Sequence, residues 1–161
     1  MSVAERLREL GLVLPQPMVL PPSVVTAFSW VRVSGSRVLV SGHGAQNPDG
    51  SPAAPFGRVP DEVPLEQAQR SARLAALSVM ASVQRTLGDL DRVSAWVTVS
   101  GFVNSEPGYA QTTAVLNAFS EVVVDVFGPV IGDHARTAIG VVALPLNLPV
   151  VVAAELQVSA N

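Results

Sequence analysis

Apolar residues recur at helical spacing in two long segments of the chain. In the first segment they lie mostly three and four residues apart and form one stripe: Ala68, Ala72, Ala75, Ala76, Val79, Met80, Val83 and Leu87. Because residues at this spacing share one face of a helix, the pattern predicts a helix over Leu65–Leu87. Pro64 at its start and Gly88 just past its end are typical helix boundaries.

The second helical segment opens at "NSEPGYAQ". Ser105 suits the N-cap, and Gly128-Pro129 is expected to end the helix. A short amphipathic helix is also expected over residues 4–11, near the start of the chain. The apolar stripe of the second long helix consists of Leu116, Phe119, Val123, Val126 and Phe127.

Valine-rich runs bounded by turn residues predict the strands. "FSWVRVSGSRVLVSG" holds two such runs around Ser34-Gly35-Ser36, which is a hairpin signal, and "VSAWVTVSGFV" predicts a further strand. A short strand is expected near residues 57–59, inside a Pro/Gly-rich loop. The apolar stretch Ala138–Leu156 is broken by Pro145 and Pro149 into two runs of strand length. We therefore expect a closing β-hairpin there and not a membrane span.

The order of these elements, β-β-(β)-α-β-α-β-β, predicts an α+β fold with a mostly antiparallel sheet and two long helices on one face. Both faces of the closing hairpin are apolar, as the run Ala138–Ala143 illustrates. An antiparallel sheet with one solvated face normally alternates apolar and polar residues. Two helices can cover only one face, so the second apolar face predicts contact with another chain.

Composition supports this interpretation. The chain has 161 residues, of which 48% are hydrophobic and 14% charged, too apolar for disorder and apolar for a small monomer. The length favours one domain over residues 23–161, preceded by a short helix and a Pro-rich lead-in over residues 1–22. A net charge of -3 without a basic run argues against a nucleic-acid partner. The first residues lack the apolar core of a signal peptide, so no membrane partner is expected.

The missing residue types exclude several chemistries. All ten cationic residues are arginines, which excludes a lysine Schiff base such as the one that holds pyridoxal phosphate. The chain has no cysteine, so it has no thiol nucleophile; this also fits a reducing compartment, and we expect the cytoplasm. His43 and His134 are the only histidines and show no metal-ligand spacing. Neither a metal nor another cofactor is expected.

Arg136 is the sharpest candidate for binding. It stands at the head of an apolar segment with Asp133 as its nearest acid in sequence. Its guanidinium suits two-pronged capture of a carboxylate. The structural alternatives are an ion pair at a subunit interface with an acid such as Asp133 or Glu155, or a surface arginine whose apolar stem packs on the protein while its charge stays in water. "SGHGA", residues 41–45, is a second candidate, because two glycines let a backbone approach a ligand. A tight turn explains the same glycines.

Three segments resemble the RidA/YjgF family of reactive intermediate deaminases. "ARTAIGVVALPLNLPVVVAAELQV" is similar to the family's C-terminal signature of an arginine, small residues, Leu-Pro and a Val/Ile-rich strand. "RVLVSGHGAQNPDG" resembles its strand, Ser-Gly-Gln and loop. "LEQAQRSARLAALSVMASVQRTLGDLDRVSAWVTVSGFVN" resembles its first helix and next strand. The resemblance spans roughly residues 28–158.

The resemblance implies a chorismate-mutase-like fold and a homotrimer, with sheets facing the centre and ligand clefts between subunits. Family enzymes hydrolyse imines or enamines to 2-keto acids and ammonia. The family arginine that holds the substrate carboxylate corresponds to Arg136. The family serine corresponds to Ser41, a tyrosine to Phe28 and the glutamine of Ser-Gly-Gln to His43. These four are the expected substrate-binding residues, and the expected partner is a small carboxylate such as a 2-imino or 2-keto acid.

The chain departs from the family at other polar positions. The family asparagine corresponds to about Thr113 and the family cysteine to Ala138. The glutamate thought to activate water corresponds to Val151. Glu155 lies on the same strand face but about 13 Å further along, so it is a poor substitute. No catalytic residue can be assigned.

Two classes of function follow. One is an imine or enamine deaminase weakened by the loss of the glutamate. The other is a non-catalytic trimer that binds a carboxylate, for example in regulation. Some relatives carry ribonuclease or translation-inhibitor labels, but the acidic charge of this chain makes that third function less favoured.

Overall fold

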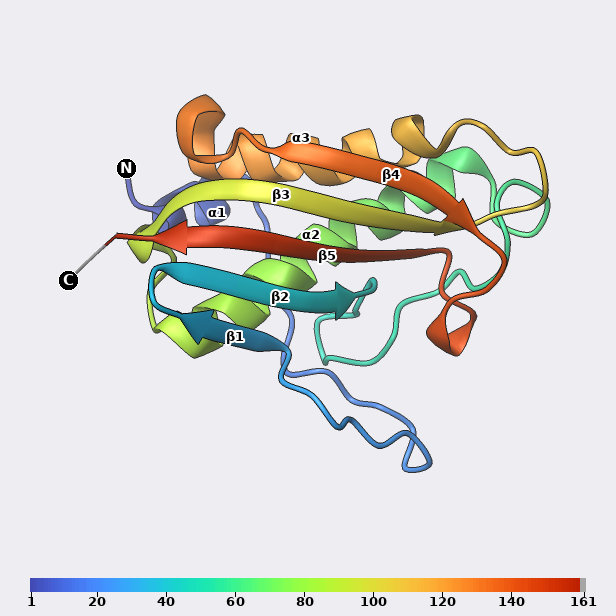
Figure 1. Ribbon diagram of the computed structural model, residues 1–161, viewed down its shortest axis with the longest axis horizontal. Coiled ribbons are helices and arrows are strands. Elements are labelled where there is room, and N and C mark those ends of the chain that lie inside the picture. Colours follow the sequence, from blue (N-terminus) through green and yellow to red (C-terminus); the bar gives the residue numbers. More distant parts are fainter. Residues whose placement is uncertain (160–161) are drawn as a thin grey trace.

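A computed structural model describes residues 1–159 and shows an α+β fold built on a five-stranded sheet (Figure 1). Strands β1 (Val31–Ser34), β2 (Arg37–His43), β3 (Val93–Asn104), β4 (Ala135–Val141) and β5 (Val150–Val158) lie in the order β1-β2-β5-β3-β4. The helices are α1 (Val3–Glu9), α2 (Leu65–Leu87) and α3 (Thr112–Ile131), with short 3₁₀ turns η1 (Leu90–Arg92) and η2 (Pro145–Asn147). The predicted fold class is confirmed.

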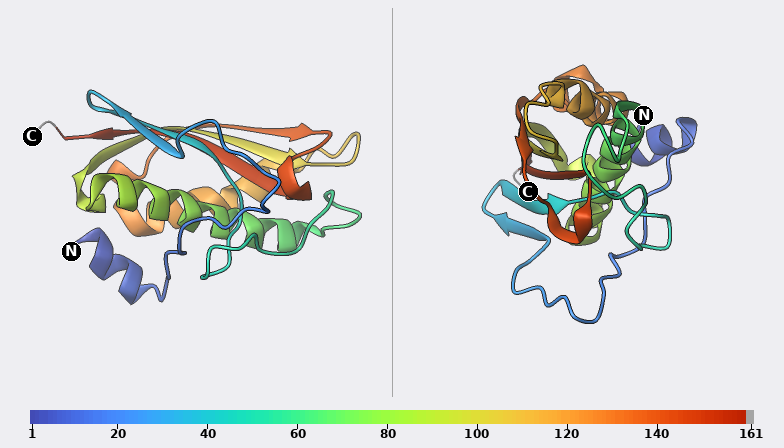
Figure 2. Two further views of the ribbon diagram at one scale, coloured as in Figure 1. Left: turned by 90° about the horizontal axis from the view of Figure 1, so that it is seen from below. Right: turned by 90° about the vertical axis from the view of Figure 1, so that its right-hand side faces the viewer.

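All three helices lie on one face of the sheet (Figure 2). Helix α2 has the predicted bounds and packs beside α3. Its stripe of alanines is fully buried, because small side chains let α2 approach the sheet and α3 closely. Gly88 ends α2 at φ 82, a left-handed conformation that glycine adopts without strain. The hairpin predicted around Gly35 is also present, as β1 pairs with β2 antiparallel.

The predicted closing hairpin is wrong. Strand β5 inserts between β2 and β3 and is antiparallel to both, whereas β4 pairs with β3 in parallel at the sheet edge. The reason is α3, which carries the chain from the end of β3 back to the start of β4 as a β-α-β crossover. The turn that contains Pro145 and Pro149 then returns the chain past β3 into the centre of the sheet.

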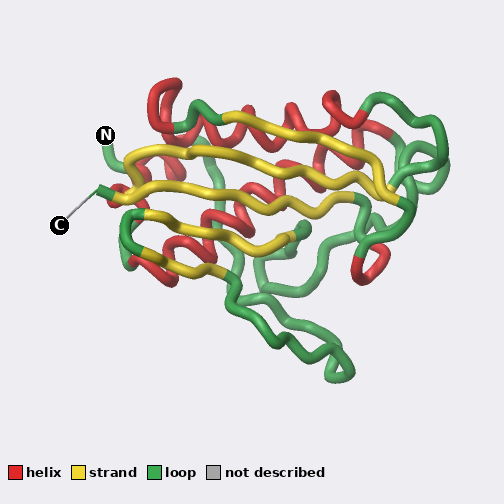
Figure 3. Tube along the Cα trace, viewed as in Figure 1, coloured by secondary structure: helices red, strands yellow, loops and turns green. Residues whose placement is uncertain are grey.

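Several helix and strand boundaries also differ from the prediction. Helix α3 begins at Thr112, and Ser105 instead forms an isolated bridge with Val59, which is all that exists of the expected short strand. Gly128 breaks the helical geometry of α3 at φ 81, but one further turn continues to Ile131. Helix α1 covers Val3–Glu9 and therefore ends two residues earlier than expected. Loops gather beside β1 and at the end of the sheet where β3 and β4 stop (Figure 3).

The helices leave the other face of the sheet uncovered (Figure 2). Apolar residues with partly exposed side chains lie on this open face. Phe102 of β3 pairs with Val151 of β5 and Ile139 of β4 on this open face. Ile139 is 45% exposed and Val97 is 37% exposed. By contrast, Val152 faces the helices and is fully buried. The apolar second face expected from the sequence is therefore present, and its burial against another chain stays a prediction.

Candidate functional site

Arg136 lies on the edge strand β4, and its side chain reaches the surface of α3. Nη1 donates to Ser120 Oγ at 2.8 Å, and Nη2 donates to Asn117 Oδ1 at 2.8 Å and to the Thr113 carbonyl oxygen at 3.4 Å. Partial burial lowers the pKa of Arg136, but an arginine keeps its charge at neutral pH. The contacts with α3 fix the direction of a guanidinium that remains partly open to solvent.

A short chain of hydrogen bonds supports this orientation. His134 Nδ1 lies 2.7 Å from the Gly132 carbonyl oxygen, and Nε2 lies 2.8 Å from Ser120 Oγ. A carbonyl oxygen can only accept, so Nδ1 carries a proton, and in that tautomer Nε2 can accept from the Ser120 hydroxyl. Ser120 Oγ then keeps a lone pair for Arg136. His134 therefore orients Ser120 toward the guanidinium.

Arg136 has no acid beside it in the part of the chain that the structure describes. Within residues 1–159, no carboxylate oxygen lies within 4.0 Å of its guanidinium nitrogens. Glu155 instead pairs with Arg37, with Nε and Oε1 2.6 Å apart. This pairing lowers the pKa of Glu155 through the hydrogen bond from Arg37. Neither Asp133 nor Glu155 of the same chain therefore pairs with Arg136, and an ion pair across an interface between copies stays a prediction.

The other expected binding residues lie at the opposite edge of the sheet. Ser41 lies on β2, and its Oγ donates to the carbonyl oxygen of Ser29, just before β1, at 2.7 Å. Phe28 precedes β1 as well, and its side chain is 55% exposed. Two strands, β5 and β3, separate β2 from β4. At about 4.8 Å per strand, Arg136 is on the order of 14 Å from Ser41 across the sheet. One chain alone does not bring these residues together.

His43 lies in the core, with 1% of its surface exposed. Its Nε2 lies 2.8 Å from Ser82 Oγ on α2, and Nδ1 contacts the Ser41 carbonyl oxygen. The Trp30 ring packs edge-on at a centroid distance of 5.2 Å. Burial lowers the pKa of His43, against the opposing effect of the bond to Ser41 and with added repulsion from Arg85. The ring thus anchors the strand end instead of facing an open cleft.

A cavity of about 320 Å³ lies on the open face beside β5. Side chains from the lead-in, β5 and the turn at η2 form its walls, and Thr26 is the only lining residue with a polar side chain apart from the Trp30 indole. Sequence reasoning missed this cavity, because its walls come from segments far apart in the chain and no local pattern marks them. The apolar wall residues include Val24, Phe28, Trp30, Leu146, Leu148 and Val151.

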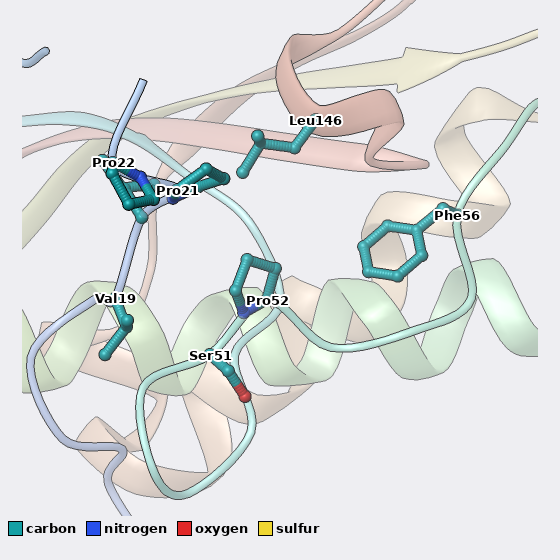
Figure 4. Close-up of a pocket in the computed structure, with 8 residues that line it drawn as sticks. Val19, Pro21, Pro22, Ser51, Pro52, Phe56 and Leu146 are labelled. Atoms are coloured by element: carbon teal, nitrogen blue, oxygen red, sulfur yellow. The ribbon is translucent and has the colours of Figure 1, made fainter. Parts of the chain in front are cut away.

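A wider and shallower hollow of about 530 Å³ adjoins the cavity (Figure 4). Leu146 lines both, and it reaches from its turn toward Pro21 of the lead-in, with Phe56 on the far side of the hollow. Leu146 has φ 56, an uncommon conformation for a branched residue. The lead-in segment thus forms walls for both spaces.

The fold and the arginine on the edge strand define a class of small α+β proteins with one helical face and one open sheet face. No family model matches the chain. Protein TCP17 of Trypanosoma cruzi is 36% identical over 157 residues, which cover 98% of this chain and 94% of that protein. The crystal structure of Atu1372 from Agrobacterium tumefaciens, a protein of unknown function, is 31% identical with a TM-score of 0.86 and covers 99% of this chain and 93% of its own.

More distant structures share the fold. A Shewanella oneidensis protein described as a candidate endoribonuclease is 21% identical with a TM-score of 0.89, covering 98% and 100% of the two chains. The Rid family protein YyfA of Yersinia pestis is 17% identical with a TM-score of 0.60, covering 89% and 98%. E. coli TdcF, solved with bound serine, is 16% identical with a TM-score of 0.60, covering 91% and 98%. The chain belongs to the RidA/YjgF (Rid) family.

Proposed function

We propose that this protein binds a small carboxylate, such as a 2-keto or 2-imino acid, through Arg136 in a cleft between subunits. The observation that carries the proposal is a guanidinium that is oriented by Ser120 and Asn117 and has no carboxylate partner within residues 1–159. An oriented arginine recognises a carboxylate through paired, charge-assisted hydrogen bonds. E. coli TdcF, which shares the fold, was solved with serine, a small molecule that carries a carboxylate.

A second copy of the chain is part of the proposed site. Arg136 lies at one edge of the sheet, while Ser41 and Phe28 lie at the other. Contact between the open faces of neighbouring copies would cover Ile139 and Val97 and bring opposite edges together. The resemblance to the family supports a homotrimer as this assembly. The expected location in the cytoplasm belongs to the same proposal.

Turnover is proposed to be slow or absent. Val151, at the position of the family glutamate, faces an apolar cavity and offers no lone pair to accept a proton from water. A positioned general base typically contributes ~10²–10⁴ in rate. Glu155, the next acid on the strand, is engaged by Arg37. The protein therefore acts as a carboxylate binder with weak imine or enamine deaminase activity, or as a purely non-catalytic binder.

Thermal protection by pyruvate tests the binding proposal. A ligand at about 100 times its Kd stabilises the native state by about 2.7 kcal/mol, or roughly 5–10 °C of Tm for a chain of this size. Arg136→Ala should abolish this protection, and Arg136→Lys should restore little of it, because an ammonium lacks the two-pronged geometry. Arg58→Ala is the matched control, since Arg58 already has a carboxylate partner in Glu106 at 3.6 Å.

The stability of the unliganded variant separates the two roles of Arg136. Its partners on α3 can exchange the lost hydrogen bonds for water, so Arg136→Ala should lower the free energy of unfolding by only about 1 kcal/mol. Sedimentation should give three times the 16.8 kDa chain mass for both proteins. If Arg136→Ala collapses the assembly and pyruvate never protects the wild type, Arg136 is a structural residue and the proposal is wrong.

A further inference from the structure

The apolar cavity beside β5 is enclosed enough to be a binding site and is unusually free of polar groups. Its volume of about 320 Å³ falls at the lower end of the range for small-molecule pockets, about 300–1,000 Å³. That volume is much larger than a methyl group and fits one aromatic ring or a branched aliphatic chain. Val151 forms part of the floor, so the cavity occupies the position of the lost family glutamate.

Two aromatic rings give the cavity a rigid wall. Phe28 packs edge-on against Trp30 at a centroid distance of 5.0 Å, and Trp30 packs on the buried ring of His43 at 5.2 Å. His43 is in turn held by Ser82 of α2. A wall anchored to the core is already in place before a ligand enters, which lowers the entropy lost on binding. Phe28 is nevertheless 55% exposed, so folding of one chain leaves much of its ring available.

Two glycines keep the floor of the cavity in place. A Cβ at Gly42 would lie 2.8 Å from Val151 Cγ1, and a Cβ at Gly44 would lie 2.5 Å from Leu148 Cδ1. Neither glycine needs a left-handed backbone, so side-chain proximity explains them. Any larger residue at either position would displace Val151 or Leu148, both of which line the cavity. This answers why the segment around His43 carries glycine on both sides.

We infer that the cavity holds the apolar side chain of the ligand whose carboxylate is bound by Arg136 of a neighbouring copy. This inference rests on the proposed function and narrows it to a class: 2-keto or 2-imino acids with aromatic or branched aliphatic side chains. Acids with a methyl or hydroxymethyl side chain would leave most of the cavity empty. Valine at position 151, in place of the family glutamate, then changes which acid is bound, because the floor of the cavity is apolar and not charged.

Calorimetric titration of the assembled protein with pyruvate and phenylpyruvate tests the inference. Burying an aromatic side chain contributes enough to tighten binding roughly 10- to 100-fold, so phenylpyruvate should bind at least tenfold tighter. Phe28→Ala should reduce that preference at least about fivefold, because it removes one wall of the cavity. Phe56→Ala is the matched control: Phe56 is 43% exposed and lines only the adjoining hollow, so the preference should persist.

The outcomes separate the inference from the proposed function. Equal affinities for the two acids, both lost in Arg136→Ala, would leave the carboxylate site standing and overturn the apolar cavity as part of it. A preference for phenylpyruvate that survives Phe28→Ala would also overturn it. Failure of both acids to bind at millimolar concentration would overturn the proposed function and the inference together. Preference lost in Phe28→Ala and kept in Phe56→Ala is the supporting result.

Discussion

Replacing His43 by glutamine should remove much of the acid sensitivity of folding. The imidazole is 1% exposed, and burial lowers its pKa below the ordinary value of 6.5. Because the pKa of the folded state is depressed, the unfolded chain takes up the proton first as the pH falls through 6.5. The stability present above that pH is therefore lost progressively below it. Glutamine does not titrate and can still donate to Ser82.

The magnitude follows from linkage. Each unit by which the folded pKa lies below the unfolded pKa removes about 1.4 kcal/mol once the pH is below both values. For a chain of this size that corresponds to roughly 3–5 °C of Tm per unit. Against this, His43→Gln loses the ring contact with Trp30, which contributes about 0.5–1.5 kcal/mol. The variant should be less stable than wild type near about pH 8, and the gap should narrow or invert by about pH 5.

Thermal melts of wild type and His43→Gln across this pH range provide the measurement. His134→Gln is the control, because it removes the other histidine, which lies between α3 and β4 and contacts Ser120 of α3. A Tm of His43→Gln that falls with pH in parallel with wild type would refute the assignment of the acid sensitivity to His43. The variant should also keep its affinity for pyruvate, since His43 contacts the core and does not line the cavity.

Three further substitutions test packing, assembly and catalysis. Val152→Asp places an unpaired charge at a fully buried position and should cost several kcal/mol, seen as loss of the folded circular dichroism signal. Val142→Asp, at a position that is 78% exposed, should leave Tm within about a degree or two of the wild-type value. A changed sedimentation coefficient of this variant would place Val142 in the contact between copies. Val151→Glu should raise imine hydrolysis in an assay coupled to an amino-acid oxidase and lower Tm by a few degrees. A rate equal to wild type would mean that the cleft no longer matches the family geometry.

Local patterns determined the elements that depend on nearby residues. The sequence predicts α2 with its observed bounds, because its apolar stripe repeats every three or four residues and its end signals, Pro64 and Gly88, lie directly beside its first and last residues. The hairpin around Gly35 followed from its turn for the same reason. Residue identity alone excluded lysine and thiol chemistry. It also marked Arg136 as a cation in need of a partner, and the resemblance supplied the family.

Only the tertiary structure decided which strands are neighbours and what surrounds each candidate residue. The apolar runs that became β4 and β5 carry no local signal of partner or direction. The crossover through α3 placed β4 beside β3, so β3 lies between β4 and β5, which were expected to pair as a simple hairpin. The same packing gave Arg136 its contacts with Ser120 and Asn117, and it placed the side chain of His43 in the core. The apolar cavity arose only where separate segments met, because enclosure is a property of contacts between distant parts of the chain.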